Sequence, residues 1–147
     1  MKKITLGLVF LLWNTAPAWA VLGQSVDSVE SDRKMLEGRV ESVTLPYYSI
    51  HQITRDGGMT VKEYVSPKGI VFGVSWQGPT MPNLSQLLGN YYGDFQRAAE
   101  SRVRRRGPIS VRTGDLVVES GGHMRAFHGR AYVLSLVPNT VTKEVVQ

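Results

Sequence analysis

Short runs of β-branched and aromatic residues alternate with glycine- and proline-containing turns along most of the chain from Tyr47 onward. Runs of this length, bounded by such turns, are typical of β-strands. Strands joined by so few residues pair antiparallel, because a parallel pair needs a long crossover connection. The pattern therefore restricts most of the chain to an antiparallel sheet.

Six strands are predicted, three on each side of one helical segment. They span Tyr47–Thr54, Thr60–Val65, Ile70–Trp76, Ile109–Arg112, Asp115–Glu119 and Met124–Leu134. The predicted turns between them are Asp56-Gly57-Gly58, Pro67-Lys68-Gly69, Thr113-Gly114 and Ser120-Gly121-Gly122. Glycine and proline supply the backbone angles that tight turns need.

A single long helix is predicted between the two groups of strands. Its apolar residues recur at helical spacing and form one stripe: Leu84, Leu87, Leu88, Tyr91, Phe95, Ala98 and Ala99. Asn83 stands where an N-cap is needed, and Gly107-Pro108 ends the helix. Gly89 and Gly93, away from the stripe, either admit a second backbone or interrupt the helix. The fold class that follows is α+β, in the order β-β-β-α-β-β-β, with the helix packed on one face of the sheet.

The segments on either side of this domain, which covers residues 46–138, are less regular. Apolar residues at helical offsets predict a short amphipathic helix within Ser28–Val40, inside an N-terminal arm over residues 21–45. Gly23–Val26 is predicted to be a loose part of this arm. Residues 139–147 are predicted to be an exposed C-terminal tail.

The first twenty residues have the three parts of a cleavable signal peptide. Two lysines follow Met1, Ile4–Trp13 is an uncharged apolar run, and Ala18-Trp19-Ala20 places small residues at the cleavage position. We expect cleavage between Ala20 and Val21. Ten apolar residues form a helix of about 15 Å, which is too short for about 30 Å of hydrocarbon. The pattern therefore predicts export rather than anchoring, and a mature chain without a transmembrane segment.

The basic character of the mature chain is local. Removal of Lys2 and Lys3 leaves 15 basic against 12 acidic residues, a net charge of +3 instead of +5. Four arginines account for more than this excess: Arg102, Arg104, Arg105 and Arg106. They either stabilise the end of the preceding helix or bind an anionic lipid, a polysaccharide or an acidic protein. No aromatic residues interleave with them, so we expect no nucleic acid partner.

One polar constellation contains residue types that can perform acid–base chemistry or bind a metal ion. If the turn at residues 56–58 is a three-residue loop with a bulge, His51 lies opposite Glu63 on the neighbouring strand. His123 or His128, from the second hairpin, could complete the group, and Arg125 lies between them in the sequence. The alternative is an ordinary cross-strand surface pair. The chain has no cysteine, which excludes thiol chemistry and cysteine zinc sites, and no spacing indicates a metal site or a cofactor.

Ser75 lies in a segment that partly resembles a nucleophile motif. Its segment departs from G-x-S-x-G because the closing Gly78 comes one residue late, and no helix begins directly after it. We therefore expect no nucleophile there. Phe72 and Trp76, in the same apolar strand, are predicted to be core residues.

Several blocks of residues resemble a family of small exported proteins of Gram-negative bacteria, catalogued as domain of unknown function 2844. The resemblance covers residues from Tyr47 to Pro138. Its blocks are Glu63-Tyr64-Val65, Gly69, Val71-Phe72-Gly73-Val74-Ser75-Trp76, Gly78-Pro79, Pro82, Leu87-Leu88-Gly89 and Ser120-Gly121-Gly122-His123-Met124-Arg125-Ala126-Phe127. It implies an export signal but no activity, cofactor or catalytic residue. The arginine cluster is not part of the shared pattern.

Three functional hypotheses remain from the sequence. The first is a non-enzymatic periplasmic or secreted module that binds an envelope protein, anionic lipid or polysaccharide. The second is a small envelope hydrolase or metal-dependent enzyme that uses His51, Glu63 and His123. The third is an assembly factor that offers an exposed sheet edge, formed by Tyr47–Thr54 or by the last strand.

Overall fold

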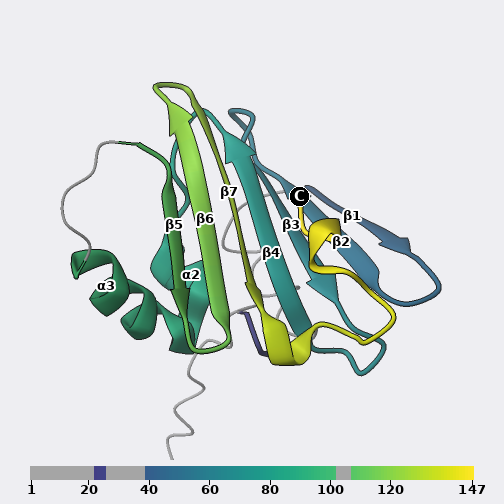
Figure 1. The fold of residues 1–147 in the computed structure, drawn as a ribbon. Helices are drawn as coiled ribbons and strands as arrows, with labels where there is room; N and C mark the ends of the chain where they lie inside the picture. Colours follow the sequence, from purple (N-terminus) through teal and green to yellow (C-terminus); the bar gives the residue numbers. More distant parts are fainter. Residues whose placement is uncertain (1–21, 26–38, 102–106) are drawn as a thin grey trace, which may run out of the picture.

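A computed structural model describes residues 22–25, 39–101 and 107–147, and most of them form one seven-stranded antiparallel sheet (Figure 1). The strands are β1 (Arg39–Thr44), β2 (Ser49–Thr54), β3 (Thr60–Val65), β4 (Val71–Gly78), β5 (Ile109–Thr113), β6 (Leu116–His123) and β7 (Ala126–Val133). Their spatial order is β1-β2-β3-β4-β7-β6-β5. The first four strands are consecutive neighbours; the chain then crosses to the far edge and returns, so that β7 pairs with β4. The predicted α+β class with an antiparallel sheet is confirmed.

Strand β1 lies where the sequence predicts the end of a helix, so the prediction is wrong for Arg39 and Val40. These residues pair with Thr54 and Ile53 of β2. As an edge strand, β1 is exposed at five of its six residues, and it therefore lacks the alternation of buried apolar residues that signals a strand. The earlier part of the predicted helix, residues 28–38, lies outside the described residues.

The predicted helix is present but interrupted. It comprises α2 (Leu84–Leu88), a 3-10 turn η2 (Gly89–Tyr91) and α3 (Tyr92–Glu100). The Asn83 side chain accepts a hydrogen bond from the amide of Ser85 at 3.1 Å, which confirms the N-cap. Gly89 has φ of 48°, a conformation that glycine adopts readily and that breaks the α-helix. Gly89 therefore interrupts the helix, which is one of the two alternatives that the sequence left open for it.

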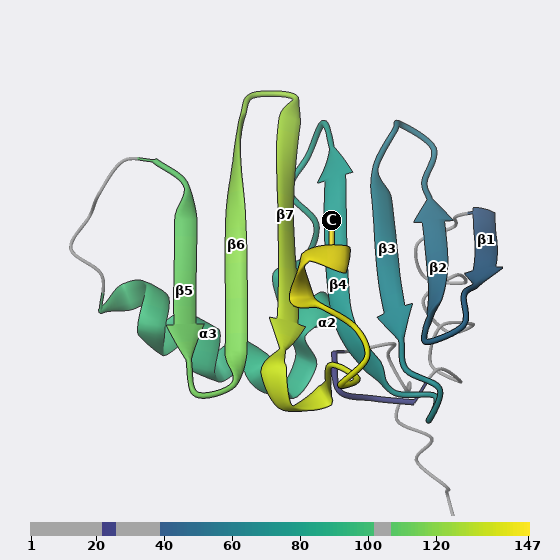
Figure 2. The same cartoon turned by 45° about the vertical axis from the view of Figure 1, so that its right-hand side comes forward.

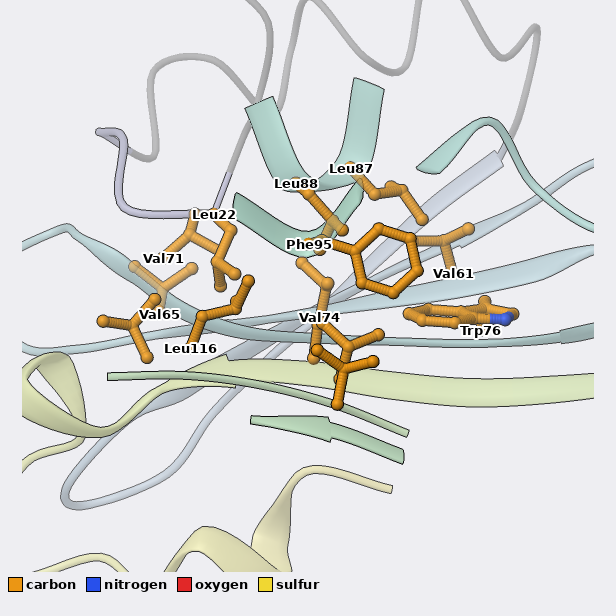
Figure 3. Packing of buried hydrophobic residues seen from close by; sticks show 14 of the residues in the cluster. Leu22, Val61, Val65, Val71, Val74, Trp76, Leu87, Leu88, Phe95 and Leu116 are labelled. Carbon is orange, nitrogen blue, oxygen red and sulfur yellow. The ribbon is translucent and has the colours of Figure 1, made fainter. Parts of the chain in front are cut away.

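The main hydrophobic core lies between the helical segment and one face of the sheet (Figure 3). Leu87, Leu88 and Phe95 point from the helices toward the strands, as the apolar stripe predicts. Trp76 belongs to this core, whereas Phe72 packs in a second cluster on the opposite face; both are at most 2% exposed, as predicted.

Leu22 joins the same core and is 1% exposed. The amide of Leu22 donates to the carbonyl of Leu87 at 3.2 Å, and the amide of Gly23 donates to the carbonyl of Val71 at 2.8 Å. Ser25 forms a β-bridge with Ile70. The prediction that this segment is loose is therefore wrong for residues 23–25, because it forms backbone hydrogen bonds to elements far along the chain.

The other face of the sheet carries the C-terminal segment, which crosses β4 and β7 on the side away from the helices (Figure 2). It contains the 3-10 turns η3 (Leu134–Leu136) and η4 (Lys143–Val145). Val146 is fully buried, which contradicts the prediction of an exposed tail. It packs against Gly73, where a Cβ atom would come within 2.7 Å of Cγ2 of Val146. The missing side chain at this glycine makes room for the valine.

The hairpin of β6 and β7 is longer than predicted. Ser120-Gly121-Gly122 continues β6 instead of forming a turn, and the chain reverses at Met124 and Arg125. At Gly122 the backbone has φ of 120°, and a Cβ atom there would come within 2.8 Å of Cα of Phe127. Glycine is therefore needed for close approach of the two strands rather than for chain reversal.

Candidate functional site

The predicted pair of His51 and Glu63 is present, since the register of β2 and β3 sets them opposite each other. Glu63 is fully buried and His51 is half-buried. The hydroxyl oxygen of Ser42 lies 2.8 Å from Nδ1 of His51, and that of Ser49 lies 3.4 Å from Nε2. Burial lowers the pKa of His51, which favours the neutral form of its ring. The contacts of both ring nitrogens hold the ring in place between the two serines.

The remaining histidines lie elsewhere. His123 ends β6, which is four strand steps from β2, or roughly 19 Å at about 4.8 Å per step. His128 projects from the face opposite to Glu63, because successive side chains alternate along a strand. The structure therefore does not bring His51, Glu63 and His123 together. Across residues 22–25, 39–101 and 107–147, no three His, Cys, Asp or Glu side chains are grouped so as to hold a metal ion.

Three further predictions have different outcomes. The arginines of the basic cluster, Arg102, Arg104, Arg105 and Arg106, lie outside the described residues. Ser75 is 5% exposed, and its hydroxyl donates a hydrogen bond to the main-chain oxygen of Gln147 at 3.1 Å. The two strands proposed as sheet edges, β2 and β7, are both interior, and β1 and β5 form the edges instead.

A continuous polar surface covers part of the sheet face that carries the C-terminal segment. Paired residues in an antiparallel sheet project to the same side, so the register defines rows of side chains across the strands. The first polar row consists of Ser110, Glu119, Arg130, Ser75, Lys62 and Gln52. The second polar row consists of His128, Gln77 and Thr60. Each row spans strands that are far apart in the sequence.

Both polar rows line an open groove of about 1200 Å³, which we call the polar groove. Arg130 and Glu119 form an ion pair within it, with Nε 2.7 Å from Oε2. The Arg130 guanidinium also lies 5.9 Å from the centre of the Tyr132 ring. Burial, and to a lesser degree the charge of Glu119, raises the pKa of Tyr132. Arg125, in the β6–β7 turn, adds a further cation to the lining.

Gln147 is one of the residues that line the polar groove. Its main-chain oxygen accepts hydrogen bonds from the Tyr64 hydroxyl at 2.6 Å, from Ser75 at 3.1 Å and from the Lys62 ammonium at 3.3 Å. Donors from two strands thus converge on one oxygen. Chemically, this arrangement binds acceptor oxygens.

Sequence reasoning did not identify Lys62, Gln77 or Arg130 as a group. Alternating polar residues in Thr60–Val65 were a usable signal for one exposed face of β3. The missing information is the pairing of β4 with β7, which joins the two halves of each row across the helical crossover.

None of the helices in the described ranges is long and apolar enough to cross a membrane. A family model described as "Protein of unknown function (DUF2844)" matches residues 18–146. Neither the curated proteins nor the solved structures contain a match to the chain.

Proposed function

Because the chain belongs to this family, whose description names no activity, we propose its role from its own surface. The chain acts as an exported, non-enzymatic binding module of the cell envelope, and the polar groove binds its partner. The signal-peptide pattern of residues 1–20 supports export to the periplasm or beyond.

The single observation that supports binding is the polar groove itself. The two polar rows present amide, hydroxyl and charged groups on adjacent strands, and the groove that they line has a volume of about 1200 Å³. Pockets for small ligands have volumes of about 300–1,000 Å³. An open groove of this size on a sheet therefore suits a segment of a polymer better than an enclosed metabolite.

Binding through the groove is tested with two matched variants of the mature chain, residues 21–147. Gln77→Trp places a large side chain in the groove, because Gln77 is exposed and is one of the lining residues. Lys68→Trp places the same side chain in the exposed β3–β4 turn, outside the groove lining. Immobilised chains are exposed to envelope proteins, to soluble polysaccharide and to anionic vesicles.

We expect Gln77→Trp to reduce capture of one of these three classes at least tenfold, and Lys68→Trp to leave it unchanged. Equal capture by both variants would show that the partner binds elsewhere on the molecule. No capture of any class by the unmodified mature chain would reject the proposal.

A further inference from the structure

The last described residues are recognised through their main chain. The amide of Gln147 donates to the Tyr64 hydroxyl at 3.1 Å, and the same hydroxyl donates to the main-chain oxygen of Gln147. The Arg130 guanidinium donates to the main-chain oxygen of Val146 at 3.1 Å. Side chains of the sheet thus hold the peptide group between Val146 and Gln147 and the main-chain oxygen of Gln147, although Gln147 is an exposed residue.

The same two residues have one apolar anchor. Val146 is fully buried in a cluster with Tyr64, Phe72 and Tyr132. Gly73 lies directly beneath it, and a Cβ atom there would clash with the valine at 2.7 Å. This seat accepts a small β-branched side chain beside hydrogen bonds from sheet side chains to main-chain atoms, so it holds both a side chain and the backbone of a peptide.

The C-terminal segment and the polar groove share their binding groups. Lys62, Ser75 and Arg130 contact residues 146–147 and also line the groove. The segment adds no strand to the sheet, and Lys143 and Glu144 are exposed in η4, the 3-10 turn directly before Val146. Residues 146–147 are held by one buried side chain and a few hydrogen bonds, whereas the rest of the segment packs against the same cluster through Leu134, Leu136, Val137, Val141 and Val145. Residues 146–147 can therefore open at a lower free energy than the whole domain.

We propose that the seat of residues 146–147 and the polar groove form one site for an extended polypeptide segment, and that the C-terminal segment is its tethered competitor. The incoming peptide places a valine or isoleucine over Gly73 and its carbonyl oxygens against Lys62, Ser75 and Arg130. A polysaccharide has neither peptide groups nor such an apolar side chain, so the observed contacts favour a peptide. This inference rests on the proposed binding function and specifies the class of partner.

The experiment uses the full mature chain and a fluorescent peptide with the sequence of residues 138–147. A tethered segment has an effective concentration near the millimolar range, so it competes strongly with a peptide in solution. Val146→Ser weakens the tether and leaves the seat intact. We expect it to bind the peptide at least tenfold more tightly than the unmodified chain, as measured by fluorescence anisotropy.

Two controls identify the seat. Gly73→Val combined with Val146→Ser fills the seat, and we expect it to lose the gain in affinity. A peptide of residues 138–147 that carries Val146→Asp should not bind to the Val146→Ser variant of the protein. Should the double variant fail to fold, hydrogen exchange on the unmodified chain provides the test, because the peptide should increase exchange at the amide of Gln147.

Three outcomes would overturn the inference: no gain in peptide affinity for Val146→Ser, equal binding of the aspartate peptide, or a gain for anionic polysaccharide without one for peptide. If one of these outcomes occurs while Gln77→Trp still abolishes capture of the envelope partner, the peptide inference fails and the proposed function stands. If the peptide binds as expected but Gln77→Trp leaves capture unchanged, the proposed function fails instead.

Discussion

At the scale of single residues, two glycines show opposite requirements for space. Gly129 on β7 lies beneath Trp76, and a Cβ atom there would come within 2.5 Å of Cε2 of the ring and 2.7 Å of the main-chain oxygen of Glu119. Gly93 in α3 has no neighbouring atom within 4 Å of such a Cβ. The first site requires glycine for packing, and the second does not.

We therefore expect Gly129→Ala to lower the free energy of unfolding by about 1–3 kcal/mol, the usual range for an overpacked core. Gly93→Ala should raise it by up to about 1 kcal/mol, because alanine is the better helix former. Urea denaturation of both variants measures the difference. Equal effects at the two sites would contradict the packing of Trp76 on β7.

His51 makes the stability of the fold depend on pH. Its pKa in the folded state is below the ordinary value of 6.5, because the ring is partly buried. As the pH falls through 6.5, the unfolded chain takes up a proton before the folded chain does, so the free energy of unfolding falls. Above that pH both states carry a neutral ring, and this contribution disappears.

Replacement of His51 by glutamine should therefore flatten the dependence of stability on pH between about pH 7.5 and about pH 5. His123→Gln, at an exposed site, is the matched control and should retain the dependence of the unmodified chain. Denaturant titrations at a series of pH values give both slopes. An unchanged slope for His51→Gln would mean that another group carries the pH dependence.

At the scale of elements, the short N-terminal segment is part of the core. Leu22 is 1% exposed and packs with residues from the sheet and from α2. We expect Leu22→Ala to cost about 2–5 kcal/mol, as for other buried leucines. Gln24→Ala, at an exposed neighbour, should cost little, and thermal denaturation compares the two. A small loss at Leu22 would show that the segment contributes little to the fold.

Local signals in the sequence were enough for some elements and not for others. The Asp56-Gly57-Gly58 turn fixes the register of β2 and β3, so the opposition of His51 and Glu63 could be predicted from spacing alone. The burial of Val146 could not be predicted, because it depends on Gly73, which is remote in the sequence and near in space. Edge strand β1 was missed because most of its residues are exposed.

The candidate site needed information of longer range. The polar residues of β3 and β4 are visible as alternating positions, but their continuation into Glu119 and Arg130 requires the pairing of β4 with β7. No turn specifies that pairing, since the helical segment and two strands intervene. From the sequence, the arginine cluster was a candidate binding site instead, because a run of charged residues can be recognised without knowledge of the strand pairing.

At the scale of the whole molecule, the two faces of one sheet have different roles. The face toward α2 and α3 buries the larger core, including Leu22 near the start of the described chain (Figure 3). The opposite face holds the C-terminal segment (Figure 2). The polar groove lies on the same face. Both ends of the described chain are thus bound to the sheet, one on each face.

The burial of Leu22 bears on the cleavage site that the sequence predicts for a signal peptide. Cleavage after Leu22 would remove a core side chain, whereas cleavage between Ala20 and Val21 leaves it in place. We expect the full chain, expressed in a Gram-negative host, to appear in the periplasm or medium with Val21 as its first residue. N-terminal sequencing of that fraction identifies the cleavage site.

The variant Ala20→Arg tests the predicted cleavage site, because signal peptidase requires a small residue at this position. We expect Ala20→Arg to slow cleavage and to leave the uncleaved precursor in the cell fraction. Val21→Ala, one residue beyond the cleavage site, should be processed normally. If the unmodified protein stayed in the cytoplasm as the intact chain, the result would contradict export. It would also contradict the proposal that the polar groove binds a partner in the cell envelope.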